Sequence, residues 1–253
     1  IRITDSLGHI HAANIIHKDI NPSNIVENPD TGQLKIIDFG IAVLVPRENP
    51  TLRNPEQLEG TLAYLSPEQT GRINRSVDYR TDLYSLGVTF YELLTGQPPF
   101  TGSDAMELVH CHIAKTPVPP CEVCSDLPSV ISDIVMKLLA KNAEDRYQSA
   151  PGVKADLEKC LHRKNLRGFE NLGGLSGDLS KHRKNLRGFE NLGGLSDLSD
   201  LSKDFSFELG QNDFSGQFQI PQKLYGRDNE VRTLLQAYER VSSGKTEMML
   251  VAG

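Results

Sequence analysis

The sequence predicts an α+β fold that is mainly α-helical and carries one small β hairpin. Apolar residues recur at helical spacing in several segments of residues 1–161, and breakers separate these segments. Two short β-prone segments flank a tight turn, which is typical of a hairpin. Of the 253 residues, 38% are hydrophobic, which is enough to build a core.

The first predicted element is an amphipathic helix over residues 1–14, because apolar side chains recur there at helical spacing. Residues 25–26 and 34–37 then predict two strands, joined by a turn at residues 28–32. Such a hairpin would bring together three polar residues that lie around it: Asp19, Asn24 and Asp38.

Residues 17–40, HKDINPSNIVENPDTGQLKIIDFG, resemble the catalytic core of protein kinases, whose pattern is H-R-D-x-x-x-x-N followed by D-F-G. Phosphoryl transfer needs a carboxylate that orients the attacking hydroxyl, and oxygen ligands for the magnesium ions on ATP. The resemblance implies that Asp19 is the catalytic carboxylate and that Asn24 and Asp38 hold Mg²⁺. The residues implied to bind the nucleotide and its metal are Asn24, Asp38, Phe39 and Gly40.

Two positions of the catalytic segment depart from the family pattern. Lys18 stands where most kinases have Arg, and an ammonium group cannot grip a phosphate in the bidentate manner of a guanidinium. Asn21 stands where the family usually has a Lys that steadies the transferring phosphate. Either activity is reduced or another group substitutes.

After Gly40 a long polar stretch predicts an activation segment, which ends in GTLAYLSPE at residues 60–68. This ending resembles the family's G-T-x-x-Y-x-A-P-E, with Ser66 in place of Ala. The resemblance implies that Thr61 lines the substrate site and touches the catalytic carboxylate. It favours Ser and Thr hydroxyls as acceptors.

Residues 80–95 predict a buried helix that ends at Gly96. Near its start, Asp82 resembles the Asp of the family's D-x-W-S-x-G, which braces the catalytic loop, with Tyr84 in place of the Trp. Asp82 would also suit a plain N-terminal cap of the helix, and the two interpretations are compatible.

Further helices are predicted at about 104–115, 128–140 and 149–161. Between the last two lies Arg146, which kinases usually hold against the Glu that ends the activation segment. The resemblance therefore suggests a buried pair between Arg146 and Glu68.

The four cysteines are too sparse for a disulfide framework, so we expect reduced thiols. Cys121 and Cys124, with His110 and His112, could supply zinc ligands, although their spacing matches no familiar finger. His9 and His11 are expected at the helix surface or in packing, and no histidine is assigned to a metal.

From residue 162 the character of the sequence changes. The segment HRKNLRGFENLGGLS at 162–176 recurs identically at 182–196, a period of 20 residues. Two copies rich in glycine do not make a stacked repeat, so we expect a flexible linker over 162–221, with a docking motif as an alternative.

Residues 222–253 predict a helix followed by a strand that ends in Gly253. The segment resembles the start of an AAA-type ATPase module, like those joined behind kinase domains in large bacterial signalling proteins. The Lys and Ser/Thr of a phosphate-binding loop would come later, so no nucleotide hydrolysis is expected from this segment.

The resemblance covers residues 1–161 and implies a kinase C-lobe, with the N-lobe upstream of Ile1. We therefore expect part of a bacterial serine/threonine kinase that is inactive alone, and whose parent chain adds the N-lobe and downstream ATPase or sensor domains. Its partners would be proteins with Ser or Thr acceptors. A pseudokinase scaffold and a zinc module are the alternatives.

The composition argues against two classes of partner, nucleic acids and membranes. The formal net charge of −6 offers no basic footprint for nucleic acid. No apolar run approaches the roughly 18 residues of a membrane span. The chain starts at Ile1 without a leader pattern, so we expect a cytoplasmic fragment of a longer protein with neither nucleic-acid nor membrane partners.

Overall fold

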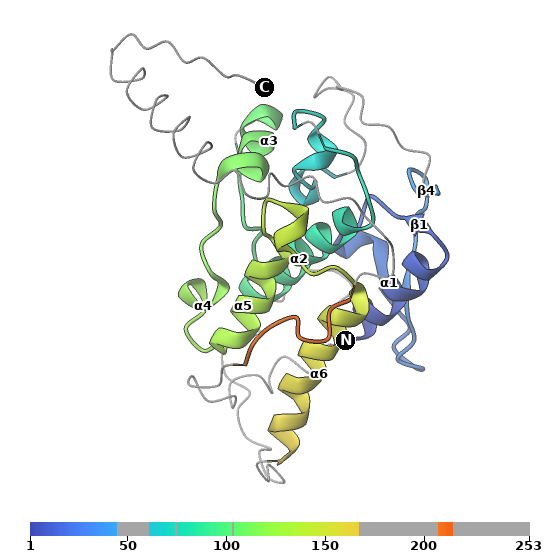
Figure 1. The fold of residues 1–253 in the computed structure, drawn as a ribbon, viewed down its shortest axis with the longest axis vertical. Coiled ribbons are helices and arrows are strands. Elements are labelled where there is room, and N and C mark those ends of the chain that lie inside the picture. Colours follow the sequence, from blue (N-terminus) through green and yellow to red (C-terminus); the bar gives the residue numbers. More distant parts are fainter. Residues whose placement is uncertain (45–60, 74, 103, 167–206, 215–253) are drawn as a thin grey trace, which may run out of the picture. The chain divides into compact units, whose positions relative to one another are not determined.

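The computed structural model describes residues 1–44, 61–73, 75–102, 104–166 and 207–214 (Figure 1). The chain divides into two units, residues 1–218 and 219–253, and every described residue belongs to the first. The six helices of the described part are α1 (Arg2–Ala12), α2 (Arg80–Thr95), α3 (Ala105–Ala114), α4 (Pro120–Val123), α5 (Ser129–Leu138) and α6 (Ala150–Leu166). The four described strands are β1 (Ile15–Ile16), β2 (Ile25–Glu27), β3 (Leu34–Ile36) and β4 (Val43–Leu44).

These elements confirm the predicted mainly helical α+β class. Helix α2 has the predicted bounds, and α1, α3 and α5 begin and end within two residues of the prediction. Helix α6 continues five residues past the predicted end, into the first copy of the duplicated segment. Because periodic apolar residues fix a helix more firmly than its ends, this level of agreement is expected.

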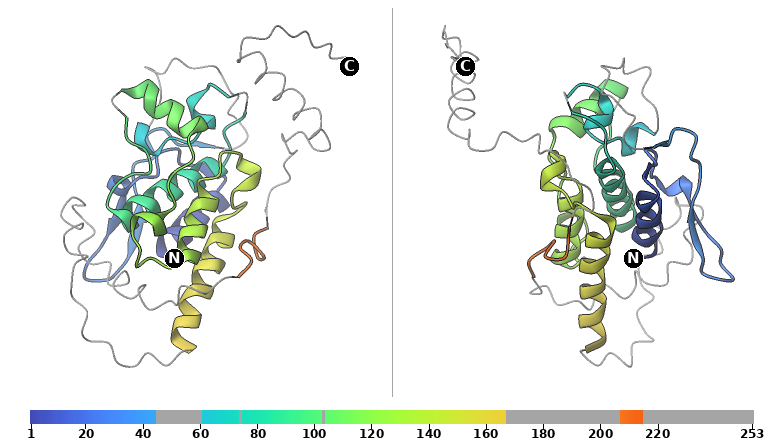
Figure 2. Two further views of the ribbon diagram at one scale, coloured as in Figure 1. Left: turned by 90° about the vertical axis from the view of Figure 1, so that its left-hand side faces the viewer. Right: turned by 45° about the vertical axis from the view of Figure 1, so that its right-hand side comes forward.

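Helix α2 occupies the centre of the described part, between α1 and α5 (Figures 1 and 2). Most of its residues are buried, which explains why apolar side chains surround it rather than form one stripe. It approaches α5 closely at Gly87, where an added Cβ would lie 2.7 Å from Leu138 Cβ. The core joins residues of α1, α2, α5 and α6 with the inner face of the hairpin: Leu7, Leu83, Leu86, Ile134, Leu138, Val153, Ile25 and Ile36.

Two small antiparallel sheets involve the region around residues 17–40: β2 and β3 lie within it, and β1 and β4 flank it. Strands β2 and β3 form the predicted hairpin, in the register Ile25↔Ile36, and the left-handed conformation of Gly32 (φ +66°) turns the chain between them. Strands β1 and β4 also pair, with Ile16 opposite Val43. The sequence did not predict this second pair, whose two-residue strands are too short for a period to be recognised.

Residues 207–214 contact α5 and α6, although the sequence assigned them to the linker. The duplicated segment beyond residue 166 and the predicted ATPase segment lie outside the described residues. Within the part of the chain that the structure describes, no helix combines the length and hydropathy that a bilayer crossing requires.

Candidate active site

The carboxylate of Asp19 is held from two sides. Its Oδ1 accepts a hydrogen bond of 2.9 Å from the Thr61 amide, and its Oδ2 accepts one of 3.0 Å from Asn24 Nδ2. The same Asn24 amide group donates to the Asp19 carbonyl oxygen at 2.9 Å. Asp19 is only partly buried, so its carboxylate keeps a face open to solvent. A carboxylate fixed in this way can accept a further hydrogen bond from a hydroxyl group.

Asp82 holds the backbone that leads into Asp19. Its Oδ1 accepts from the Lys18 amide at 2.7 Å and its Oδ2 from the His17 amide at 2.9 Å. The carboxylate is fully buried, and no side-chain cap bond is made at the start of α2. The structure therefore supports the interpretation of Asp82 as a brace of this loop rather than as a helix cap.

Two further side chains of this brace were missed from the sequence. His11 Nε2 lies 2.9 Å from Asp82 Oδ2, so this histidine of α1 does more than pack. Gln69 donates from Nε2 to the Lys18 carbonyl oxygen at 2.8 Å. Neither contact has a local sequence signal, because both partners lie more than 50 positions away.

The hairpin places Asn24 and Asp38 at its open end. Asn24 directly precedes β2, Asp38 follows β3 by two residues, and the Ile37 amide donates to the Asn24 carbonyl oxygen at 2.9 Å. Asp38 Oδ1 accepts from the Gly40 amide at 3.2 Å, and Asp38 is exposed. Among the described residues, no hydrogen-bond donor engages Asn24 Oδ1 or Asp38 Oδ2. Amide and carboxylate oxygens are the ligands that Mg²⁺ prefers, so the donor set fits this metal.

The remaining residues of the motif complete the loop. Phe39 packs edge-to-face on the His17 ring, with centroids 4.8 Å apart, and His17 Nε2 lies 3.0 Å from the Ile37 carbonyl oxygen. Asn21 accepts from the Ser23 amide at 2.9 Å and donates to the Thr61 hydroxyl at 3.4 Å. Asn21 therefore braces the loop but brings no positive charge to it.

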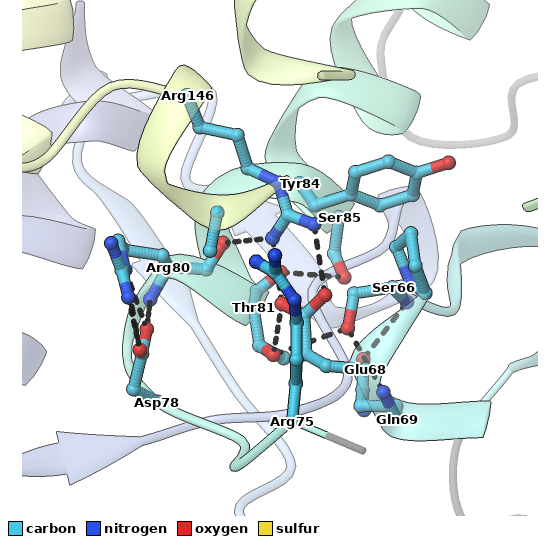
Figure 3. A network of polar contacts seen from close by, with 12 residues as sticks. Ser66, Glu68, Gln69, Arg75, Asp78, Arg80, Thr81, Tyr84, Ser85 and Arg146 are labelled. Carbon is cyan, nitrogen blue, oxygen red and sulfur yellow. Dashed lines mark hydrogen bonds and ion pairs between the residues drawn. The ribbon is translucent and has the colours of Figure 1, made fainter. Parts of the chain in front are cut away.

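Glu68 and Arg146 form the buried pair that the resemblance suggested (Figure 3). Arg146 donates to both Glu68 oxygens, at 2.6 and 2.8 Å, and the Thr81 hydroxyl donates to Glu68 Oε1 at 2.8 Å. Burial alone would raise the pKa of Glu68, but the Arg146 guanidinium holds this pKa below its usual range. The end of the activation segment is thereby fixed to α2 and to the loop before α6.

Ser66 and Gln69 connect the end of the activation segment to the loop that carries Lys18 and Asp19. The Ser66 amide donates to Gln69 Oε1 at 3.0 Å, and the Ser66 hydroxyl lies 3.1 Å from the Thr81 hydroxyl. A serine in place of the family's alanine is thus accommodated by a hydrogen bond inside the network of Figure 3. Gln69 then carries the network to the Lys18 carbonyl oxygen.

The zinc hypothesis finds no support in the described residues, which contain no group of three or more candidate metal ligands. His112 is buried against Tyr84, whose hydroxyl lies 3.0 Å from His112 Nδ1. Cys121 and Cys124 are free thiols.

Comparison with known proteins identifies the family. The family model described as protein kinase domain matches residues 1–158. Hybrid signal transduction histidine kinase G of Dictyostelium discoideum is 43% identical over 193 residues, which are 76% of this chain and 5% of that protein. Serine/threonine-protein kinase PknB of Mycobacterium tuberculosis is 41% identical over 152 residues, 60% of this chain and 24% of that protein. Probable serine/threonine-protein kinase PknB of Bifidobacterium longum is 38% identical over 155 residues, 61% and 22% of the two chains.

The chain spans less than a quarter of the length of each of these relatives. Its match to the family model nevertheless covers more than half of its own residues, and includes the loop, the hairpin and the Glu68–Arg146 pair described above. The chain therefore belongs to the protein kinase domain family.

Proposed function

We propose that this chain is the C-lobe portion of a serine/threonine protein kinase that transfers the γ-phosphate of ATP to Ser or Thr hydroxyls. The observation that carries the proposal is the Asp19 carboxylate, which is oriented by the Thr61 amide and by Asn24 Nδ2 while one face stays open. A carboxylate held in this way can orient an acceptor hydroxyl and take its proton as the phosphoryl group is transferred.

Each neighbouring residue would have a defined part in that reaction. Asn24 Oδ1 and the Asp38 carboxylate would hold Mg²⁺, which neutralises developing charge on the phosphates when it is bound. Thr61 would line the acceptor site, since its amide already contacts the Asp19 carboxylate. Asp82 and Gln69 would act as positioning residues through the backbone of Lys18.

The proposed kinase is tested by removing the Asp19 charge without changing the shape of the side chain. The assay would use the chain together with any residues that its gene encodes upstream, and would measure phosphate transfer from Mg²⁺-ATP to Ser and Thr. Asp19→Asn should lower kcat by at least about a hundredfold. Asp30→Asn is the matched control, because Asp30 is exposed in the hairpin turn. Full activity in Asp19→Asn would overturn the proposal.

A scaffold that binds partners without catalysis is the second candidate, and Asn21 is the observation that favours it. Both polar atoms of the Asn21 side chain are engaged within the loop and with Thr61, so no cation from this position reaches the phosphate. The candidate predicts that wild-type protein and Asp19→Asn transfer phosphate equally slowly. Any activity that Asp19→Asn abolishes would exclude it.

We further propose the domain organisation expected from the sequence: a C-lobe at 1–161, a linker at 162–221 and the start of an AAA-type ATPase module at 222–253. The family match ending at residue 158 supports the first boundary. A longer protein with this order would place protein substrates, the N-lobe and the ATPase module among the partners of the C-lobe.

A further inference from the structure

Residues 207–214, with the sequence FELGQNDF, lie along α5 and α6 (Figures 1 and 2, orange). They follow the duplicated segment and lie 49 or more positions after the end of the family match at residue 158. The contacts that they make with the domain are reciprocal, since the segment supplies a half-buried carboxylate to the domain and the domain supplies a buried carboxylate to the segment. These mutual contacts distinguish the segment from a stretch of chain that only lies on the surface of the domain.

The first carboxylate belongs to the segment. Asp213 accepts from the Gln148 amide at 2.5 Å and from the Ser149 hydroxyl at 2.8 Å, directly before the start of α6. The Ser149 hydroxyl in turn accepts from the Gly152 amide at 3.0 Å, as an N-terminal cap does. Asp213 therefore lies at the positive end of the α6 dipole, which favours its anion, while burial raises the pKa of its carboxyl.

The second carboxylate belongs to α6. Asp156 is fully buried, and its Oδ2 accepts from the Gly210 amide at 2.6 Å and from the Tyr147 hydroxyl at 2.8 Å. Lys159 completes its environment with an ion pair of 3.0 Å. Without the segment, Asp156 Oδ2 would lose the hydrogen bond from the Gly210 amide. Only water could then take the place of this donor at the charged oxygen.

Two cations and two apolar side chains add to these bonds. Lys137 donates to the Leu209 carbonyl oxygen at 3.2 Å, and Lys159 lies 4.9 Å from the centre of the Phe207 ring. Phe207 and Leu209 also pack against the main core. The segment thus buries apolar surface as well as satisfying polar groups.

Gly152 shows that the fit depends on close approach. A Cβ built at this position would lie 2.6 Å from Asp213 Cγ, a distance that real Cβ atoms do not adopt. Alanine is otherwise preferred over glycine inside a helix. All three atoms that this Cβ would approach most closely belong to the Asp213 side chain, so the close packing at Gly152 involves the segment directly.

We propose that residues 207–214 are an intramolecular docking motif that binds the α5–α6 face of the kinase domain. The motif places residues 207–214 against α5 and α6, although the duplicated segment separates them from α6 in the sequence.

Hydrogen exchange of the full 253-residue chain tests the motif, with the Gly210 amide as the reporter because it donates to the buried Asp156. In the wild-type chain, peptides containing this amide should exchange at least about tenfold more slowly than an unstructured peptide of the same sequence. Gly152→Ala should remove this protection while the amides of α2 stay protected. Gly8→Ala is the matched control, since its Cβ would meet Ala150 and Pro151 only at 3.9 Å.

Two more variants keep the test decisive if Gly152→Ala disturbs α6 itself. Asp213→Ala changes only the docking segment and should also remove the protection at Gly210. Deletion of residues 177–196, which leaves one copy of the duplicated segment, should retain the protection because the motif supplies its own contacts. Exchange of the wild-type segment at the unstructured rate would overturn the proposal, as would protection that survives both Gly152→Ala and Asp213→Ala.

Discussion

Replacing Arg146 by Leu is expected to destabilise the domain more than any change at an exposed ion pair such as Arg2–Glu27. Arg146 is fully buried and donates to both oxygens of Glu68, whose side chain is 4% exposed. It also donates to the carbonyl oxygens of Ala140 at 2.7 Å, Lys141 at 3.0 Å and Arg80 at 3.1 Å. Breaking such a buried pair costs about 3–5 kcal/mol, because the remaining charge and the freed carbonyl groups stay without partners.

The measurement is urea-induced unfolding followed by circular dichroism, with the unfolding temperature as a second readout. A loss of about 3–5 kcal/mol corresponds to a fall in Tm of about 6–20 °C for a domain of this size. Arg2→Leu is the control: the Arg2 side chain is 49% exposed, and a surface pair is worth at most about 1 kcal/mol.

A second variant distinguishes the loss of the ion pair from an unfavourable effect of the new leucine side chain itself. Glu68→Gln combined with Arg146→Leu removes the orphaned carboxylate, so the double variant should be more stable than Arg146→Leu alone. The reasoning is refuted if Arg146→Leu costs less than about 1 kcal/mol, or if the double variant shows the sum of the two single effects.

Three further outcomes follow from the structure. Burial, followed by the Lys141 charge, lowers the pKa of His112 to about 4. As the pH falls from 7, His112 therefore takes up a proton in the unfolded state before it does so in the folded state. About 3 kcal/mol of the free energy of unfolding should be lost between pH 7 and pH 4. Unfolding curves of His112→Gln should lack this slope. Gly87→Ala should destabilise the domain by about 1–3 kcal/mol, because the clash of the new Cβ with Leu138 outweighs the gain in helix propensity; a Tm at or above that of the wild type would contradict this. Asp82→Asn, in the kinase assay described above, should lower kcat about tenfold or more while KM for ATP stays nearly constant, because it loosens the loop rather than the nucleotide site.

The sequence predicted those parts of the fold that repeat a local signal over many residues. Helix α2 was predicted to the residue because apolar side chains recur through it and Gly96, in the left-handed conformation with φ +80°, ends it. The β2–β3 hairpin was predicted because its turn residues are distinctive. The β1–β4 pair was not, since two-residue strands that meet across the catalytic segment carry no period.

For the candidate site, the motifs and the resemblance pointed to the site residues, to Thr61 beside the Asp19 carboxylate and to Asp82 as a brace, but not to every side chain that holds the loop. Asp82 satisfied the criteria of a helix cap as well as those of a brace, and only the tertiary structure shows its carboxylate on the amides of His17 and Lys18. His11 and Gln69 were missed because their partners are distant in the sequence. The docking segment was missed for the same reason, since Phe207 and Leu209 are too few to form a recognisable apolar pattern.

These distant contacts have a common physical purpose at Lys18. Its backbone is in the left-handed region, with φ +70°, a conformation that costs a residue with a side chain about 1–3 kcal/mol. The strain persists because both backbone polar groups of Lys18 are hydrogen-bonded, the amide to Asp82 and the carbonyl oxygen to Gln69. The turn at Lys18 directs the next residue, Asp19, toward the Thr61 amide. The core thus holds a strained loop in which the Asp19 carboxylate points toward the Thr61 amide, as the proposed acceptor site requires.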